Sequence, residues 1–437
     1  MAALSLTEIN EWLQIRYEKV AAGMFDDFYM QANKSPFYKM IQKRTDFDAR
    51  EIQFPIFWAG RSSGSTDFAT AVEQSAVPAV EGDIWEVGDD DLEDEYSIWE
   101  FGGKALRLLK QPSASKHQFF AQLNRTIMNS EANIARRIAL KLYRDEEAFI
   151  ARFGTAATMT NARVALGNRL YGYCLQQGDA VQFTSPAGVL RAATPLYIKT
   201  IEMTTAACWA TFENAAGVET APSTLTAVAG DYIIFDGDNG AGLTGLNAWV
   251  PSSLDSGTMY GVVRNTGSIR AKQGTYLDCT GKAILLALRE IAFYAGDHGN
   301  GPDTILMDVD SAFKARQEIE SSKNYQYQMV SRSAMKSNGQ SSAVVGVEGF
   351  MVQTDKGMVS CFPDPYCEPN SAFALNMSAD YSPKLWSIGP IPGPLDDDGR
   401  LVHQRDALDS YQGRHGGHCN MIVTGPGAIV RATNLGL

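Results

Sequence analysis

The feature that most constrains the fold is an apolar stripe at helical spacing between residues 116 and 153. Its members recur at intervals of four or seven residues: Phe119, Leu123, Ile127, Ile134, Ile138 and Leu142. The turn-forming segment QPSAS precedes the stripe, and Gly154 supplies the expected end. A helix of this length would span roughly 55 Å at about 1.5 Å per residue. We therefore predict one long amphipathic helix as the spine of the fold.

Four basic residues crowd the polar side of the second half of this helix: Arg136, Arg137, Lys141 and Arg144. A charged face of this kind is most often solvated. The alternative is a docking surface for an acidic segment, and the chain has one nearby.

That acidic segment, EGDIWEVGDDDLEDE, runs from Glu81 to Glu95. Before it, EIQFPIFWA indicates a strand and GRSSGSTD a flexible tip. After it, YSIWEFGGKALRLL indicates a returning strand pair. The pattern predicts a long hairpin that projects from the body. Because two isolated strands are only marginally stable in water, the hairpin needs another chain to lie on.

Residues 171–256 are rich in predicted strands. The segments QQGDAVQF (176–183) and VAGDYIIF (228–235) share a Gly-Asp-x-hydrophobic-x-Phe pattern, and PLYIKTIEM and ACWATFEN alternate between them. We interpret this region as a small barrel or hairpin module inserted between helical stretches. Beyond it, we predict a helix over 281–294, a strand at TILMDV and a helix over 310–321. The first 35 residues also have helical spacing, which breaks at Ser35-Pro36.

Composition argues against several functional classes. The 437 residues carry a formal net charge of −12, whereas dedicated nucleic-acid binding requires concentrated Lys and Arg. No apolar run of transmembrane length occurs, and the N-terminus lacks the pattern of a signal peptide. Six widely spaced cysteines without a CxxC pair predict buried free thiols and folding in a reducing cytoplasm.

Two motifs match enzyme signatures literally. GAGLTG at 240–245 follows a strand and fits G-x-G-x-x-G, but LNAWVPSS after it cannot sustain the helix that binds a pyrophosphate. We expect a glycine-rich hairpin loop there. GRSSG places Ser62 in a G-x-S-x-G pattern, which His403, His415 or His418 could complete with Asp406 or Asp409. The preceding strand contains Pro55 and no βαβ alternation surrounds it, so a chance match is the better interpretation.

Metal sites are equally weakly indicated. His415, His418 and Cys419 form only one half of a zinc pattern, with Cys361 or Cys367 as further ligands. Residues 236–240 start like a calcium loop, but the glycine is one place early and position twelve is not Glu. We predict no catalytic residue, no cofactor and no metal site.

The order of the parts resembles that of tailed-bacteriophage major capsid proteins, which share the Hong Kong 97-type fold. Several phrases are similar to that family: GLNAWVP, MYGVVRNTGSI, GPDTILMDVDSAFKAR, the long segment 349–376, LDDDGRLVHQRDALDSYQ and AIVRATNL. The resemblance implies an α+β fold. In chain order, its segments are an N-terminal arm (1–48), an extended loop (49–110), a peripheral domain with the spine helix (111–170), a β-rich insertion (171–256), a continuation of the peripheral domain (257–299), an axial domain (300–410) and a return to the peripheral domain (411–437).

The resemblance also implies a function. Copies would assemble into hexamers and pentamers of an icosahedral head around double-stranded DNA, which they would bind only weakly. Partners would be other copies, a scaffolding protein, a portal and a cement protein, with assembly in the bacterial cytoplasm and no membrane. We expect subunit contacts at two charged groups: Asp89, Asp90, Asp91, Glu93, Asp94 and Glu95 on one side, and Arg136, Arg137, Lys141 and Arg144 on the other.

Three other functions stay open. An encapsulin-like nanocompartment shell has the same fold, but such chains are usually shorter and lack a large β insertion. A serine hydrolase would use Ser62. A β-rich adhesin or tail component would account for residues 171–256 but not for the long helix.

Overall fold

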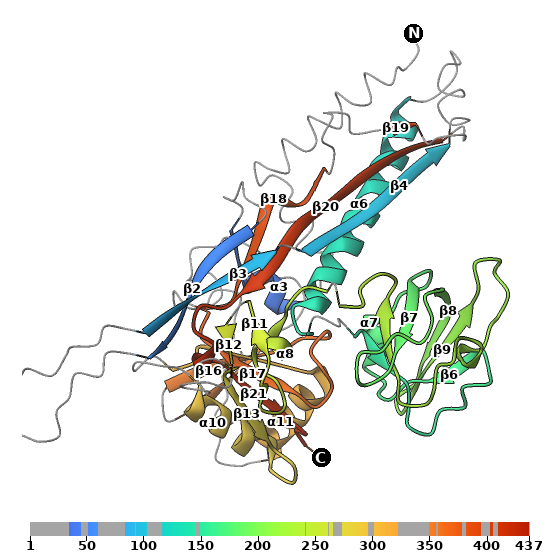
Figure 1. Cartoon of the computed structure of the whole chain (residues 1–437). Coiled ribbons are helices and arrows are strands. Elements are labelled where there is room, and N and C mark those ends of the chain that lie inside the picture. Colours follow the sequence, from blue (N-terminus) through green and yellow to red (C-terminus); the bar gives the residue numbers. More distant parts are fainter. Residues whose placement is uncertain are drawn as a thin grey trace, which may run out of the picture.

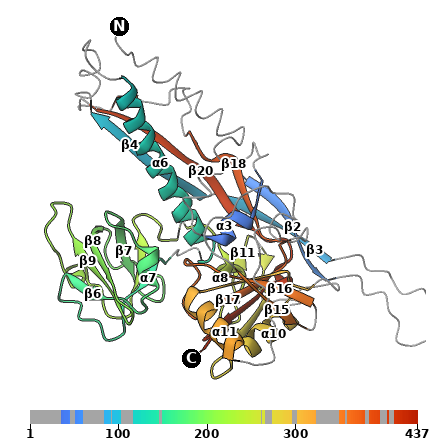
Figure 2. The same ribbon diagram turned by 180° about the vertical axis from the view of Figure 1, so that it is seen from behind.

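The computed structural model describes residues 35–44, 51–59, 84–91, 93–102, 116–145, 149–240, 242–260, 262–264, 273–295, 301–321, 349–354, 357–377, 382–394, 403–404 and 410–436. Figures 1 and 2 show a long arm, an α/β domain at the base of the arm and a barrel beside that base. Within these ranges, no helix has both the length and the hydropathy needed to cross a membrane.

The arm consists of one helix laid along a narrow sheet (Figure 1). Helix α6 (Lys116–Lys141) buries Leu123, Ile127, Ile134 and Ile138, so the predicted apolar stripe is confirmed for these residues. In the sheet, β20 (Ser410–Ile422) runs antiparallel to β4 (Glu93–Gly102) on one side and to β18 (Lys384–Pro394) and β19 (His403–Gln404) on the other. The short strand β1 (Gln42–Arg44) pairs in parallel with β18.

Helix α6 ends at Lys141, so the predicted continuation to residue 153 is wrong. The chain turns at residues 142–144, and the Leu142 carbonyl accepts a hydrogen bond of 2.8 Å from the Leu246 N–H. By Ile150 the backbone is already bonded to the barrel, through a 2.7 Å bond to the Ile233 carbonyl. Contacts from distant parts of the chain therefore end the helix, which explains why no local stop signal marks the position.

The projecting hairpin is present, but its second strand is not the one predicted. Strand β2 (Glu51–Ala59) pairs with β3 (Ile84–Asp91), which contains part of the acidic run. The predicted returning strand, YSIWEFG, lies instead in β4 and pairs with β20. Strand β4 pairs with β20 over ten residues, which is a longer pairing than β2 could provide. Pro55 is tolerated because β2 lies in a two-stranded sheet, where an edge strand can lack one donor.

The α/β domain has a six-stranded mixed sheet with the order β13-β21-β17-β14-β16-β15. The strands are β13 (Thr275–Asp278), β14 (Thr304–Met307), β15 (Phe350–Thr354), β16 (Gly357–Pro363), β17 (Ala372–Leu375) and β21 (Val430–Thr433). Helices α10 (Ile284–Tyr294) and α11 (Val309–Ser321) confirm the two helices predicted beyond the insertion.

Both faces of this sheet are covered. Ile305 and Met307 pack in the core beneath α10 and α11, whereas Leu306 joins the core shared with α6 and the barrel. This alternation follows from the two-residue period of a strand. The sheet therefore connects the helical layer to the base of the arm.

The barrel is a sheet closed on itself. Its strands follow the order β5-β10-β7-β8-β9-β6, and an antiparallel bridge between Phe153 and Leu166 joins the two ends. They are β5 (Ala151–Arg152), β6 (Arg163–Ala165), β7 (Ala180–Thr184), β8 (Leu196–Met203), β9 (Cys208–Glu213) and β10 (Tyr232–Phe235), with α7 (Tyr171–Cys174) and a 3₁₀ turn, η1 (Pro222–Leu225). Phe153, Phe183 and Phe212 pack together inside, with centroid separations of 5.3 to 5.9 Å.

The repeated Gly-Asp pattern forms two equivalent turns. Gly178 and Gly230 both have φ of +88°, which favours glycine. The Asp179 carboxylate accepts the N–H of Gln176, and the Asp231 carboxylate accepts that of Val228, both at 2.8 Å. Each turn leads into one of the paired strands β7 and β10. The pattern therefore marks the beginning of two strands and does not form a ligand-binding loop.

A short N-terminal element is fixed at the base of the arm. Helix α3 (Pro36–Met40) begins at the predicted Ser35-Pro36 break, and the Ser35 hydroxyl caps it by accepting the Tyr38 N–H. Phe37 is fully buried against Tyr143, with ring centroids 5.3 Å apart. The helix predicted before Ser35 lies outside the described residues.

Elements group differently from the predicted segments at four places. Strands β5 and β6 belong to the barrel although they precede residue 171, and β18 belongs to the arm although it lies within 300–410. Strand β13 and helix α10 lie within 257–299 but belong to the α/β domain with β14 to β17. Strand β21 also joins the α/β sheet, whereas the whole of 411–437 was predicted to return to the peripheral domain. The other boundaries stay predictions.

The prediction of buried free thiols is confirmed. All six side chains are free and buried: Cys174, Cys208, Cys279, Cys361, Cys367 and Cys419. Burial raises the pKa of the Cys208 thiol to about 11.

Candidate functional site

The basic residues of α6 face the barrel of their own chain. Arg136 pairs with Asp179 at 2.7 Å and also donates to the Cys174 carbonyl at 2.9 Å. Arg137 and Lys141 both approach Asp238, at 3.4 Å and 2.9 Å. These contacts hold the barrel against the second half of the helix.

Two of the four predicted contact residues are interior. The side chain of Lys141 is 1% exposed, and Arg144 is fully buried with its guanidinium 4.7 Å from the centre of the Phe149 ring. Arg144 also donates to the Tyr366 carbonyl at 3.4 Å. Lys141 and Arg144 are therefore corrected from a surface role to an internal one. Contacts of Arg136 and Arg137 with another subunit stay a prediction.

The six predicted acidic contact residues lie on two strands at the base of the hairpin. In β3, Asp89, Asp90 and Asp91 are in register with Gln53, Ile52 and Glu51. In β4, Glu93, Asp94 and Glu95 are in register with Cys419, His418 and Gly417 of β20. Their role in subunit contacts stays a prediction.

A buried carboxylate joins three parts of the chain. Asp364 Oδ2 accepts hydrogen bonds from the Ser35 hydroxyl at 2.5 Å, the Tyr143 hydroxyl at 2.8 Å and the Phe37 N–H at 3.3 Å. Its other oxygen accepts the Tyr366 N–H at 3.0 Å. Burial raises the pKa of Asp364, although these donors favour the ionised form. Sequence reasoning missed this residue because its partners are distant in the chain.

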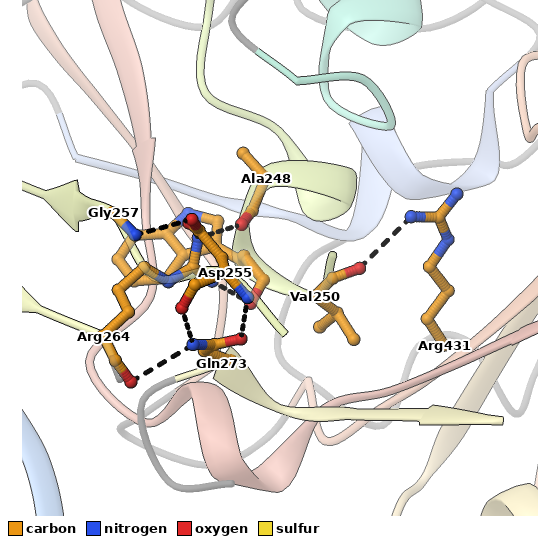
Figure 3. Close-up of polar contacts among 8 residues, drawn as sticks. Ala248, Val250, Asp255, Gly257, Arg264, Gln273 and Arg431 are labelled. Carbon is orange, nitrogen blue, oxygen red and sulfur yellow. Dashed lines mark hydrogen bonds and ion pairs between the residues drawn. The ribbon is translucent and has the colours of Figure 1, made fainter. Parts of the chain in front are cut away.

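A second polar network stiffens the segment after α8 (Leu246–Trp249). Figure 3 shows Arg264 reaching the Ala248 carbonyl at 2.8 Å and the Asp255 carboxylate at 3.0 Å. The Gln273 amide donates to the Asp255 and Arg264 carbonyls, at 2.6 and 3.1 Å, and accepts the Asp255 N–H at 3.0 Å. The network fixes the hairpin of β11 (Thr258–Met259) and β12 (Val262–Val263), and it contains no nucleophile paired with a base.

GAGLTG connects β10 to α8, so it is not a hairpin loop as expected. The prediction that no sustained helix follows is confirmed, since α8 has four residues. A Cβ on Gly245 would lie 2.3 Å from the Lys141 carbonyl oxygen and 2.5 Å from that of Arg144. Glycine is therefore required here for the chain to pass close to the end of α6.

The remaining metal candidates do not assemble among the described residues. Asp238 is occupied by Arg137 and Lys141 rather than free for calcium. Ser62, the candidate nucleophile, lies outside the described residues, so its role stays untested. Cys419 and Cys367 belong to one core cluster and Cys361 to the other. In the part of the chain that the structure describes, no group of three or more His, Cys, Asp or Glu side chains could hold a metal ion.

A cleft of about 510 Å³ lies between the seam of the barrel and the loop at residues 368–370. Backbone and small side chains form much of its wall, together with Arg152, Tyr171 and Glu368. Small-molecule sites usually have a more apolar and aromatic lining. Both charged side chains of the cleft already have partners in the chain: Glu368 lies 2.8 Å from Arg431, and Arg152 donates to the Gly230 carbonyl at 3.3 Å.

A helix along a narrow sheet, a projecting hairpin and a two-layer α/β domain together define the fold of a phage capsid protein. A chain of the solved cyanophage A-1(L) capsid asymmetric unit is similar, with a TM-score of 0.51, 10% identity and coverage of 93% of this chain and 94% of that one. The predicted α+β capsid fold is confirmed on this likeness.

Two further solved structures match with lower scores. The holo-SrpI encapsulin complex of Synechococcus elongatus has a TM-score of 0.44 at 9% identity and covers 92% of this chain and 88% of that one. The capsid of an empty GTA particle has a TM-score of 0.42 at 8% identity, with coverage of 92% and 97%. No protein-family model and no curated protein sequence matches the chain.

Proposed function

We propose that this chain is the major capsid protein of a tailed phage. Copies would assemble into hexamers and pentamers of an icosahedral head that encloses double-stranded DNA. The role is structural rather than enzymatic. Assembly would take place in the bacterial cytoplasm with a scaffolding protein and a portal, and a cement protein could bind the finished shell.

The observation that carries the proposal is the extent of the fold likeness. The similarity to the cyanophage capsid chain covers almost the full length of both chains, rather than one shared domain. A fold alone does not fix a function, because one architecture can host several. The proposal therefore needs a second observation, from the surface of this chain, that favours assembly.

The hairpin supplies that second support. Among the described strands, β2 and β3 pair only with each other, and Figure 1 shows them pointing away from the arm and the barrel. A two-stranded sheet has little stability by itself in water. It gains support by lying across a neighbouring copy, and a net charge of −12 suits a wall that should not grip its DNA.

Particle formation tests the proposal. The full chain is expressed alone and with its candidate scaffolding protein, and the products are measured by light scattering and negative-stain electron microscopy. Closed shells of uniform diameter, or free hexamers and pentamers, are the expected result. A discrete monomer or dimer under both conditions would contradict it.

Two measurements separate the alternatives. Shells assembled during phage growth should contain double-stranded DNA, whereas a nanocompartment would contain a protein cargo. A serine-reactive label that modifies Ser62 stoichiometrically would favour the hydrolase, and the same label on a Ser62→Ala variant is the control.

A further inference from the structure

The barrel is held to the rest of the chain by ion pairs on two sides that differ in burial. On the α6 side, the paired side chains of Lys141 and Asp238 are only 1% and 9% exposed. On the side of the α/β domain, Arg169 just before α7 pairs with Asp310 in the first turn of α11, and these side chains are 33% and 23% exposed. Separation of a buried pair leaves an uncompensated charge, whereas water hydrates the partners of a partly exposed pair. The α11 side is therefore the side that can open.

The cleft of about 510 Å³ lies beside this exposed ion pair. Asn168, which precedes Arg169 in the chain, lines the barrel wall of the cleft, and the loop at residues 368–370 lines the other wall. That loop is bonded to the start of α11, because the Asp308 N–H donates to the Ser371 carbonyl at 3.2 Å. The ion pair therefore joins the barrel to α11 at one edge of the cleft.

The charged groups of each wall are paired on their own side of the cleft. Arg152 on the barrel wall donates to the carbonyl of Gly230, which also belongs to the barrel, at 3.3 Å. Glu368 on the opposite wall accepts a hydrogen bond of 2.8 Å from Arg431 of β21, in the α/β domain. Opening of the cleft would leave both of these contacts intact. The ion pair at its edge, by contrast, would have to separate.

The ion pair has a defined geometry when it is closed. The Arg169 guanidinium donates through Nε and Nη2 to both carboxylate oxygens of Asp310, with the Nε contact at 3.0 Å. Such a bidentate contact fixes the orientation of the two partners. When the pair separates, Asp310 keeps a favourable position, because the N-terminus of a helix stabilises a carboxylate in its first turn. The contact therefore combines a precise closed state with a small free-energy cost of release.

We propose that Arg169 and Asp310 form a releasable latch, and that the barrel has a second position in which this pair is separated and the cleft is open. The barrel pivots about its buried contacts with α6, beside the place where the chain enters the barrel after Arg144 and leaves it at Gly245. Because the latch is a partly exposed ion pair, rising salt favours the open position. The latch belongs to the single subunit, so it is independent of the proposed function.

Energy transfer between two dyes on single unassembled subunits measures the position of the barrel. One dye is attached at Val218→Cys, in an exposed turn of the barrel, and the other at Gln317→Cys, on the exposed side of α11. The six native thiols are buried, so the chain without these two substitutions is the labelling control. Latched and open subunits differ in transfer efficiency, and the ratio of the two populations is the measured quantity.

Removal of either partner should favour the open position. Arg169→Ala and Asp310→Asn should each raise the ratio of open to latched subunits by about threefold at low salt, the effect of losing one partly exposed ion pair. The double variant should show the same rise rather than the product of the two, because both substitutions remove one interaction. The wild type should approach the variants at high salt. The matched control, Arg163→Ala, loses the exposed pair with Glu202 inside the barrel and should keep the wild-type ratio.

Three results would overturn the latch. A single population with the same transfer efficiency in the wild type and in both single variants would show that the barrel has one position. Two populations whose ratio ignores both substitutions, or changes equally in Arg163→Ala, would show that another contact holds the barrel. Rises that multiply in the double variant would show that Arg169 and Asp310 act separately. Circular dichroism shows whether each variant keeps its fold, and Asp310→Asn decides the question if Arg169→Ala unfolds.

Discussion

At the scale of single residues, the chain uses buried polar groups to hold distant segments together. Asp364 is the clearest case, because it collects donors from the N-terminal element, the end of α6 and its own loop. A buried carboxylate without these donors would be costly. The residue therefore fixes where the arm, α3 and the α/β domain meet.

Substitution of Asp364 by Asn should change how stability depends on pH. Burial raises the pKa of this carboxyl above its ordinary value of 3.8, so the folded chain binds the proton more tightly than the unfolded chain. The resulting stabilisation is greatest below the ordinary pKa and is lost as pH rises through the raised value. Asp364→Asn cannot titrate, so its free energy of unfolding should vary less with pH than that of the wild type.

Urea unfolding of unassembled subunits between about pH 2.5 and pH 7 measures this difference. A constant offset between wild type and variant at every pH would refute the titration of Asp364. Asp278→Asn is a control for which the expected pH dependence of stability has the opposite sign. Hydrogen bonds from Thr280 and Asn434 lower the pKa of Asp278, so its stabilisation is present above the ordinary pKa and is lost as pH falls.

At the scale of secondary-structure elements, the barrel depends on its charged contacts with α6. Lys141 is 1% exposed and lies 2.9 Å from Asp238, so removal of that carboxylate leaves a buried ammonium with less compensation. Asp238→Ala should lower the free energy of unfolding by about 3 kcal/mol. Thermal or urea unfolding of the subunit measures the change.

The matched control removes a carboxylate from an exposed pair. Glu202 and Arg163 approach each other with about half of each side chain exposed, so Glu202→Ala should cost at most about 1 kcal/mol. If the two substitutions lower the free energy of unfolding equally, the Asp238 contact contributes no more to stability than an exposed ion pair does.

Elements were predictable where their signals are local. The two helices beyond the insertion and the strands containing the Gly-Asp pattern carry their own period and turn residues, and they occur where expected. The end of α6 could not be predicted, because Gly245 and Leu246 approach it from a hundred residues further along. The return strand was misassigned because β20 competes for YSIWEFG from the opposite end of the chain.

The candidate site was less predictable than the fold. The basic residues of α6 were recognised as a functional group, but their partners Asp179 and Asp238 lie 43 and 101 residues away from Arg136 and Arg137. The Asp364 junction has no sequence signature, since its donors come from residues 35, 37, 143 and 366. Only a three-dimensional arrangement reveals which charges are already paired.

At the scale of the whole molecule, the cores protect every cysteine. All six thiols are buried, and burial raises the pKa of Cys208 to about 11, so roughly one in a thousand is ionised at pH 8. Native subunits should therefore react with a thiol reagent far more slowly than unfolded chains, in which six equivalents should appear. Fast stoichiometric labelling of native subunits would show that the cores open readily.

The path of the chain around the barrel has a mechanical consequence. The backbone leaves the end of α6 at Arg144 and returns to the same place at Gly245, where the Leu246 N–H bonds the Leu142 carbonyl. A pull between the arm and the α/β domain can therefore pass through this contact, and through the links from β17 to β18 and from β20 to β21, without passing through the barrel. Its outer turns, such as the one between β8 and β9, can accept added sequence without lengthening the part of the subunit that bears tension.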